Sequence, residues 1–418
     1  MKFDLPSPVL QALDRLEAQG HAAYVVGGCV RDFVLGIVPH DYDICTAASP
    51  SEMQLIFHNH RTIETGLKHG TLTVMMEGMP LEITTFRQDG EYLDGRHPAS
   101  VTFTRAVEDD LSRRDFTINA MAYSPVRGLC DPFHGREDCA LGIIRCVGEA
   151  ERRFSEDGLR ILRALRFSAR LSFPIEDDTA QALRKLKGNL QKISRERIAA
   201  ELTGILQGKD CASIVAAYGD VLAAALPELG FMDQEAWRHA GGLIPYCPVD
   251  GMIRMAAFLR SCHPSGAAKD CARQARQIMQ GLKMPVKMMD GVEQLIFHQQ
   301  HIITPGNLQE MLWRLQPEGL SRLLQMQKAI ALYEKQPEAE DRFRDLEGKM
   351  QALLASGCCY RLAQLAVKGQ DLAALGLRGP AIGAMLEVLM AQVVQEKIPN
   401  DKDKLLEYVR FNAEHLAQ

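Results

Sequence analysis

Two periodicities of apolar side chains alternate through the N-terminal third of the chain, which predicts strands mixed with helices. Residues 6–20 carry apolar side chains at helical spacing and end at a glycine, so we expect an amphipathic helix there. Residues 24–26 form a short apolar run that is typical of a buried strand. Gly27 and Gly28 then predict a tight turn, and residues 30–35 predict the first turns of a second helix.

Two β-rich runs at residues 71–75 and 81–86 flank a Gly-Met-Pro segment and predict a hairpin. Glu82 lies in the second run, either as an outward residue on an edge strand or as an acidic group near a functional site. Residues 88–103 are rich in Gly, Asp and Pro without periodicity, so we expect a mobile polar loop. Residues 107–122 begin with acidic side chains and predict one helix packed on the sheet.

Strand patterns all but disappear after residue 149, and one helical pattern follows another to the end of the chain. A mixed α/β region followed by helices predicts an α+β fold. With 418 residues, the chain is long enough for two to four compact units.

Two carboxylates at alternate positions, Asp41 and Asp43, give the strongest chemical signal. Alternation in a strand turns both side chains to one face, where they repel and raise at least one pKa unless a cation lies between them. Mg²⁺ binds carboxylate oxygens, bridges to substrate phosphates and removes that repulsion. Backbone N–H groups at Gly28 and the guanidinium of Arg31 can contact a phosphate. This segment predicts metal-assisted phosphoryl or nucleotidyl transfer; the simpler alternative is a turn with two solvated aspartates.

Arginines recur at helical spacing in residues 156–171, where Arg160, Arg163 and Arg166 form one stripe of a predicted helix. Asp157 stands three residues before Arg160, within pairing reach. A solvated amphipathic helix with one salt bridge would explain this pattern. The functional alternative is a polar template, because an acceptor and a planar donor held on a rigid helix can read the Watson–Crick edge of a base.

The composition fits a soluble globular protein, with 46% hydrophobic and 24% charged residues. We expect no membrane-spanning segment and no signal peptide, because no apolar stretch is long enough. The 11 cysteines show neither a CxxC pair nor zinc-ligand spacing, which favours reduced thiols in the cytoplasm. With a net charge of −5, the chain can bind RNA only through basic residues concentrated on one surface.

Several motifs occur in an order that resembles the class II tRNA nucleotidyltransferase and bacterial poly(A) polymerase family, with most similarity to bacterial CCA-adding enzymes. The resemblance covers most of the chain and is strongest over residues 20–210 and 367–409. It rests on the following residues: Val26-Gly27-Gly28, Arg31-Asp32, Gly36, Pro39, Asp41, Asp43, Thr84-Thr85-Phe86-Arg87, Arg113-Arg114-Asp115, Asn119-Ala120, Asp131, Gly135, Asp138, Glu156-Asp157 and Arg160. His40 stands where a lysine is common in the family, a change that leaves the two aspartates in place.

The resemblance implies a polymerase-β-like nucleotidyltransferase head at residues 1–139, with a mixed sheet plus helices. An all-helical neck for base recognition would follow at 140–210, then a helical RNA-binding body at 211–350 and a tRNA-binding tail at 351–418. It implies tRNA as the partner, held at its acceptor end and elbow, and CTP and ATP as the nucleotides. It leaves the oligomeric state open.

The resemblance also implies roles for individual residues. Asp41 and Asp43 would be the catalytic aspartates that hold Mg²⁺, with Glu82 as a candidate third ligand. Residues 88–103 would be the flexible loop that helps the switch from CTP to ATP. The nucleotide-binding set would comprise Gly28 and Arg31 for the triphosphate, Arg114 and Asp115 for ribose and phosphates, Asp157 and Arg160 for the base, and Arg163 and Arg166 on the same helix.

The sequence therefore predicts template-independent addition of CCA to the 3′ end of tRNA, with release of pyrophosphate. The alternatives are a partial enzyme that adds only CC or only A, and a poly(A) polymerase. Residues 66–71 lack the arginine-rich run of poly(A) polymerases, and the presence of residues 88–103 argues against a CC-only enzyme. A non-catalytic tRNA-binding protein is the alternative from another class, and it would have no use for two repelling carboxylates.

Overall fold

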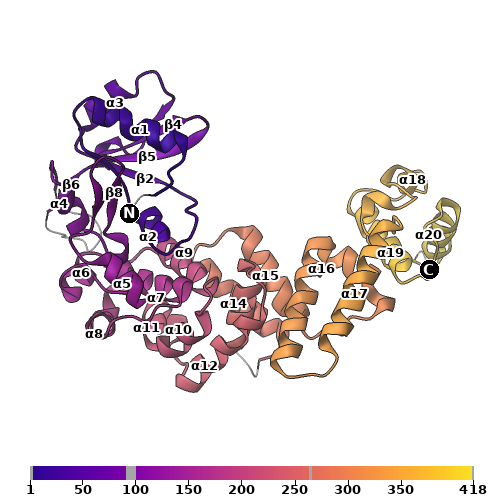
Figure 1. Ribbon diagram of the computed structural model, residues 1–418. Helices are drawn as coiled ribbons and strands as arrows, with labels where there is room; N and C mark the ends of the chain where they lie inside the picture. The colour runs from indigo at the N-terminus through magenta and orange to yellow at the C-terminus, as the bar shows by residue number, and fades with distance from the viewer. Residues whose placement is uncertain (1–2, 91–99, 263–265, 417–418) are drawn as a thin grey trace. The chain divides into compact units, whose positions relative to one another are not determined.

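The chain forms two compact units in the computed structural model, which describes residues 3–90, 100–262 and 266–416. Unit 1 comprises Met1–Arg238 and holds every strand of the described residues, whereas unit 2 comprises His239–Gln418 and is helical (Figure 1). A mixed sheet with helices followed by a long helical region confirms the predicted α+β class. The finer division into head, neck, body and tail stays a prediction.

Unit 1 is built on a mixed sheet of seven strands in the part of the chain that the structure describes, in the order β3-β4-β5-β2-β1-β8-β9. The central strands β2 and β5 run parallel, and every other neighbouring pair is antiparallel. The bounds are β1 Ala23–Val26, β2 Asp43–Thr46, β3 Thr62–Ile63, β4 Thr71–Met76, β5 Met79–Thr85, β8 Ala122–Ser124 and β9 Gly128–Cys130. A separate ribbon pairs β6 Arg87–Asp89 with β7 Val101–Phe103.

The first strand and the turn after it form where the apolar pattern predicts them. All four residues of β1 are buried, because β1 lies inside the sheet between β2 and β8. Helix α1 (Ser7–Ala18) contacts β1 and buries Leu13 and Leu16 among its apolar residues, and α2 (Gly28–Val34) follows directly after Gly27. The chain therefore leaves the sheet centre through a glycine turn.

The single helix predicted over residues 107–122 is wrong. Helix α4 (Val107–Ser112) ends early, a 3₁₀ turn η2 (Thr117–Asn119) follows, and the last residues enter β8. Ala122 pairs with β1 on one side and β9 on the other, so strand pairing outweighs the local helical pattern there.

Part of the loop predicted at 88–103 is also a strand. Gln88 and Asp89 belong to β6, and residues 101–103 form β7. Residues 91–99 of this predicted loop lie outside the described residues. Its expected part in the switch from CTP to ATP stays a prediction.

Helices make up the remainder of unit 1, and no strand follows β9 in the residues that the structure describes. Helix α7 packs against α9, which brings the arginine-bearing segment against a helix about thirty residues later (Figure 1). The remaining helices that lie wholly within unit 1 are α3 Pro50–Ile56, η1 Leu67–His69, α5 Gly135–Leu141, α6 Ala150–Glu156, α7 Leu159–Leu171, α8 Asp177–Lys185, η3 Lys187–Lys192, α9 Arg195–Leu206, α10 Cys211–Ala217, α11 Gly219–Ala225 and η4 Pro227–Leu229. Helix α12 Gln234–Gly242 spans the boundary of the two units.

Unit 2 continues with helices and has a core of its own near the C-terminus, where Leu372, Leu389 and Leu405 are fully buried. Its longest helix, α16, is broken at Gln316, whose φ of 58° is followed by Pro317. The bounds are η5 Ile244–Tyr246, α13 Gly251–Ser261, α14 Ala268–Gly281, α15 Val286–His298, η6 Pro305–Asn307, α16 Leu308–Tyr333, α17 Ala339–Ala355, η7 Leu362–Gln364, α18 Gly369–Ala374, α19 Pro380–Val394 and α20 Lys402–Leu416. Among the described helices, none has the length and apolar character needed to span a bilayer.

Candidate active site

A polar pocket of about 450 Å³ in unit 1 brings most of the predicted site residues together. It is lined from four places: the glycine turn before α2, the start of β2, the segment 113–119, and the region around α7 and α9. All predicted catalytic and nucleotide-binding residues line it except Asp41; those that do are Gly28, Arg31, Asp43, Arg114, Asp115, Asp157, Arg160, Arg163 and Arg166.

Arginines dominate the lining of this pocket. Eight arginines face three aspartates among the described residues that line it, although the chain as a whole has a net charge of −5. Positive charge is thus concentrated on one surface, as the sequence required for binding a polyanion. The eight arginines are Arg31, Arg113, Arg114, Arg160, Arg163, Arg166, Arg170 and Arg197.

Gly27 allows a guanidinium to lie against the turn. Its φ is 79°, and a Cβ added there would come within 3.0 Å of Nη1 of Arg114. Arg114 is fixed on its other side by Asp110, which accepts a hydrogen bond from its Nη2 at 3.1 Å. The turn therefore needs glycine both for its backbone conformation and for the close approach of Arg114.

The acidic edge of the site is formed by two strands. Asp43 begins β2 and lies opposite Glu82 of β5, and because β5 lies between β4 and β2, the interpretation of Glu82 as an edge-strand residue is wrong. Burial, then the charge of Glu82, raises the pKa of Asp43; Arg114 acts against this shift, and Asp41 adds to it. The described carboxylates therefore repel one another where the sequence predicts a cation.

The interpretation of Asp41 as a strand residue that alternates with Asp43 is wrong. Strand β2 begins at Asp43, so Asp41 precedes the strand and is exposed, and strand alternation does not explain how the two aspartates relate. Its charge nevertheless acts on Asp43. Within residues 3–90, 100–262 and 266–416, no group of three His, Cys, Asp or Glu side chains is already assembled as a metal site. Two carboxylates supplemented by substrate phosphates and water remain a suitable donor set for Mg²⁺.

Arg31 lines the pocket as a fixed, mostly neutralised group. It is 3% exposed, and its Nε and Nη2 donate to Oδ1 of Asp32 at 2.9 and 2.7 Å. Its Nη1 donates to Oδ1 of Asn119 at 2.8 Å. The carboxylate of Asp32 offsets the charge of Arg31. Arg31 would therefore help a phosphate site more by its fixed position than by its net charge.

Asp115 is a buried acceptor held by three donors. Its Oδ1 accepts from the N–H of Phe116 at 2.8 Å and from Nδ2 of Asn119 at 3.3 Å. Its Oδ2 accepts from Nε of Arg163 at 2.7 Å. Burial alone would raise the pKa of Asp115, but the charge of Arg163 and these hydrogen bonds outweigh it, and the pKa lies below its usual value. Asp115 therefore stays charged and fixes Arg163 in the pocket.

The salt bridge between Asp157 and Arg160, which belonged to the alternative interpretation as a solvated helix, does not form among the described residues, and the two side chains do not share one helix. Helix α6 ends at Glu156 and α7 begins at Leu159, so Asp157 lies in the connection between two helices and not on the helix of Arg160. Asp157 instead binds Arg197 of α9, whose Nη2 donates to Oδ2 at 2.8 Å.

Arg160 has its own set of partners. Its Nη1 donates to Oε2 of Glu156 at 2.7 Å and to the carbonyl oxygen of Arg153 at 3.2 Å. Its Nη2 donates to the carbonyl oxygen of Arg113 at 2.9 Å. Among the described residues, no partner is found for its Nε–H. Asp157 and Arg160 thus line one pocket from separately fixed positions.

The sequence missed three residues of this site. Phe167 is the ring against which Arg31, Arg163 and Arg166 lie, with guanidinium carbons 5.5, 5.3 and 4.8 Å from its centroid. The other two are on α9: Arg197 lines the pocket, and Glu201 forms an ion pair with the pocket residue Arg166 at 2.7 Å. Their spacing of four residues was the available signal.

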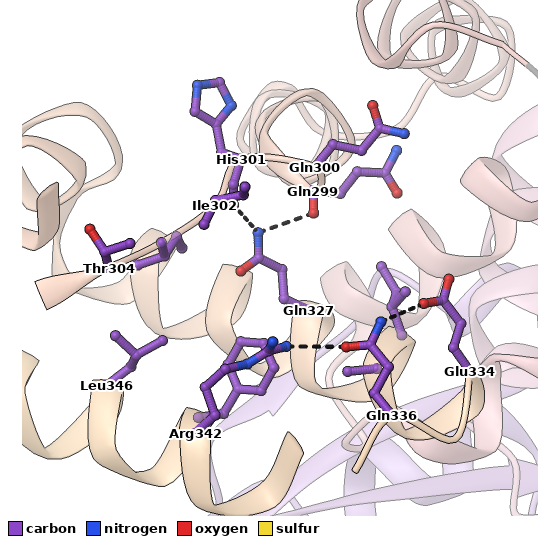
Figure 2. A pocket seen from close by; sticks show the side chains of 14 residues that line it. Gln299, Gln300, His301, Ile302, Thr304, Gln327, Glu334, Gln336, Arg342 and Leu346 are labelled. Carbon is purple, nitrogen blue, oxygen red and sulfur yellow. Dashed lines mark hydrogen bonds between the residues drawn. The ribbon is translucent and has the colours of Figure 1, made fainter. Parts of the chain in front are cut away.

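A second cavity, of about 540 Å³, lies in unit 2 and has a different character (Figure 2). Nε2 of Gln327 donates to the carbonyl oxygens of Gln299 and His301 at 3.0 and 2.8 Å, and Arg342 contacts Gln336. These amides mostly satisfy one another or the backbone. The cavity contains none of the residues predicted for nucleotide chemistry, so we place the candidate active site in unit 1.

Known protein families match three parts of the chain. The poly A polymerase head domain matches residues 23–145, and the probable RNA and SrmB-binding site of polymerase A matches residues 172–229. The putative tRNA nucleotidyltransferase domain 2 matches residues 267–409. The first match contains the glycine turn, both predicted catalytic aspartates and Asp115.

Curated relatives match the chain over nearly its whole length. A CCA-adding enzyme of Leuconostoc mesenteroides is 36% identical over 417 residues, which cover 97% of both chains. A CCA-adding enzyme of Geobacillus stearothermophilus is 34% identical, over 95% of this chain and 94% of the relative. Among solved structures, the Bacillus stearothermophilus CCA-adding enzyme in complex with CTP superposes with a TM-score of 0.81 at 31% identity, covering 98% of this chain and all of the other.

Proposed function

Because this chain belongs to the family of CCA-adding enzymes, we propose that the pocket in unit 1 joins CTP and ATP in turn to the 3′ end of tRNA. The reaction is nucleotidyl transfer: the terminal hydroxyl of the RNA attacks the α-phosphate, and pyrophosphate leaves. The observation that carries this proposal is the single pocket that combines an acidic strand edge, an arginine lining and the Asp157 and Arg160 side chains. No covalent intermediate with the protein is needed.

Asp41 and Asp43 would hold Mg²⁺, with Glu82 as the neighbouring carboxylate. When bound, Mg²⁺ would favour ionisation of the attacking hydroxyl and offset negative charge on the phosphates. The protein's own contribution is to keep two acidic side chains close together, at the cost of the repulsion that helps raise the pKa of Asp43. Asp41→Ala should abolish incorporation without loss of folding. Full activity of that variant with Mg²⁺ present would exclude the assignment.

The triphosphate would lie along the arginine side of the pocket. Gly28 opens α2, and Arg114 lies against the preceding glycine, where both can approach phosphate oxygens. Arg163 and Arg166 both belong to helix α7. Asp115 forms an ion pair with Arg163, and Glu201 forms one with Arg166. Arginines that are already fixed lose little side-chain freedom when they bind a ligand.

Base selection would depend on Asp157 and Arg160. CTP and ATP each present an exocyclic amine beside a ring-nitrogen acceptor, whereas UTP and GTP present the reverse pattern. The carboxylate of Asp157 suits the amine, and the Nε–H of Arg160, without a partner in the described chain, suits the ring nitrogen. One site can therefore accept both C and A while rejecting U and G.

The other parts of the chain would hold tRNA, at its acceptor end and elbow, while the 3′ end enters the pocket. We propose that the reaction takes place in the cytoplasm. All 11 cysteines, each within the described residues, are free thiols, in keeping with a reducing compartment.

One assay tests the activity directly. We would supply tRNA lacking the whole CCA end, tRNA lacking only the final A, and mature tRNA, each with one labelled nucleotide at a time. Addition of two C and one A to the first, of A to the second and of nothing to the third is the expected result. Addition of A to the second tRNA without any addition to the first would identify an A-adding enzyme, and long A tails would identify a poly(A) polymerase.

A further inference from the structure

We propose that Arg197 is a positioning residue for base selection, which acts by fixing the carboxylate of Asp157 from helix α9. This inference rests on the proposed base-reading role of Asp157. It adds to that role a residue forty positions later in the chain, which the sequence motif around Asp157 does not contain.

The contact is a two-point clamp. Nη2 of Arg197 donates to Oδ2 of Asp157 at 2.8 Å, and Nη1 donates to Oδ1 at 3.5 Å. Both side chains are largely buried, with 16% of Asp157 and 25% of Arg197 exposed, and both line the pocket. A planar guanidinium facing a carboxylate through two nitrogens sets the plane of that carboxylate, which a single contact would leave free to rotate.

Asp157 needs an external clamp because its own segment is not helical. It has φ of −141° and ψ of 107° in the connection between α6 and α7. Among the described residues, the carboxylate of Asp157 has one other hydrogen bond, which the N–H of Leu159 donates to Oδ1 at 3.0 Å. The guanidinium of Arg160 is bound to Glu156 and to backbone carbonyl oxygens, and its backbone N–H donates to the carbonyl oxygen of Asp157, so neither group holds the carboxylate.

The pattern of contacts also selects the oxygen that faces a base. Oδ1 accepts from Leu159 and from one nitrogen of Arg197, so its two lone pairs are both engaged. Oδ2 accepts one strong hydrogen bond and keeps a second lone pair free for an exocyclic amine. Arg197 therefore directs one defined acceptor of Asp157 into the pocket.

The test compares CTP and UTP incorporation, as ratios of kcat/KM, in the full-length enzyme. Variants are Asp157→Ala, Arg197→Gln, Arg197→Lys and the double variant of Asp157→Ala with Arg197→Gln. Arg195→Gln is the matched control, because Arg195 lies on the same helix but donates to the carbonyl oxygen of Ala225, away from the pocket. Thermal unfolding of each variant separates misfolding from an effect on selectivity.

We expect Arg197→Gln to lower the preference for CTP over UTP by about 10-fold, within the range that one bidentate base contact provides. Arg197→Lys keeps the charge but not the two-point geometry, so it should restore folding and only part of the selectivity. The double variant should be no less selective than Asp157→Ala alone, because Arg197 acts through Asp157. Arg195→Gln should keep wild-type selectivity.

Three results would overturn the inference, and they can be told apart. Wild-type selectivity in folded Arg197→Gln and Arg197→Lys, together with relaxed selectivity in Asp157→Ala, would remove the role of Arg197 and leave base reading by Asp157 intact. Additive losses in the double variant would likewise show that Arg197 does not act through Asp157. Wild-type selectivity in Asp157→Ala would refute the base-reading role itself, and the inference with it.

Discussion

Asp43 and Glu82 lie directly opposite each other on the parallel strands β2 and β5. Burial, and after it the charge of Glu82, raises the pKa of Asp43. A fold that places two acidic side chains side by side in this way loses stability unless a cation is present. The pair is therefore a site where function opposes stability.

Replacing Asp43 by Asn should stabilise the metal-free protein at neutral pH while reducing nucleotide addition by more than about 100-fold, since even partners of metal ligands contribute 10- to 100-fold. A carboxyl with a raised folded pKa contributes stability at low pH that is lost as pH rises through that pKa. The Tm difference between variant and wild type, measured in EDTA, should thus be larger at pH 8 than at pH 4.

Mg²⁺ provides the second readout for that variant. Added Mg²⁺ should raise the Tm of the wild type, because a ligand that binds the folded state stabilises it, and should raise that of Asp43→Asn much less. Equal stabilisation of both proteins would argue that Asp43 is not a metal ligand. Asp345→Asn is a suitable control, because Asp345 is exposed on α17 and pairs only with Lys349 in the described residues.

Gly27→Ala should be far more harmful than the same change at Gly20. Both glycines have positive φ, 79° and 81°, so both substitutions strain the backbone by about 1 kcal/mol. Only at Gly27 would the new Cβ meet a side chain, Nη1 of Arg114 at 3.0 Å; nothing lies within 4 Å at Gly20. We expect KM for the nucleotide to rise in Gly27→Ala and to stay unchanged in Gly20→Ala. Equal KM values in the two variants would contradict the proposed place of Arg114 beside the triphosphate.

Asp115→Asn should remove a component of acid sensitivity. The pKa of Asp115 is lowered, so its pairing with Arg163 contributes stability above the ordinary aspartate pKa of about 4 and loses it as pH falls through the lower folded value. The variant should lose about 1–3 kcal/mol of unfolding free energy at pH 7. Denaturant unfolding at pH 7 and at pH 3 measures both effects, and an unchanged difference between the two proteins would count against the pairing.

Asp157→Ala should relax nucleotide choice more than it weakens tRNA binding. The carboxylate is the acceptor offered to an exocyclic amine, and losing one such contact removes about 1–3 kcal/mol of discrimination. Misincorporation of U in place of C, set against the Kd for tRNA, measures the two effects separately. Glu151→Gln, an exposed carboxylate paired with Lys185, is the matched control. A variant that binds tRNA poorly but still rejects UTP would show that Asp157 acts on the RNA.

Local pattern was sufficient for the elements that frame the site. The apolar run at residues 24–26 becomes β1, and the glycines after it become the turn into α2, because short-range sterics and burial act within a few residues. Local pattern failed at residues 113–122, where a helical sequence is broken because Ala122 and its neighbours pair with β1.

The sequence by itself was sufficient to predict the α+β class, the family and most of the side chains that line the pocket. It was sufficient because the motifs contain the chemical groups that the reaction requires. Only the tertiary structure decided how those groups are paired. Asp157 and Arg160 are three residues apart, yet each is held by other partners, since Arg197 arrives from a helix forty residues later. Glu82 likewise lies beside Asp43 only because β5 pairs with β2. Spacing along the chain predicts contacts within one helix or strand, whereas contacts between elements depend on how those elements pack.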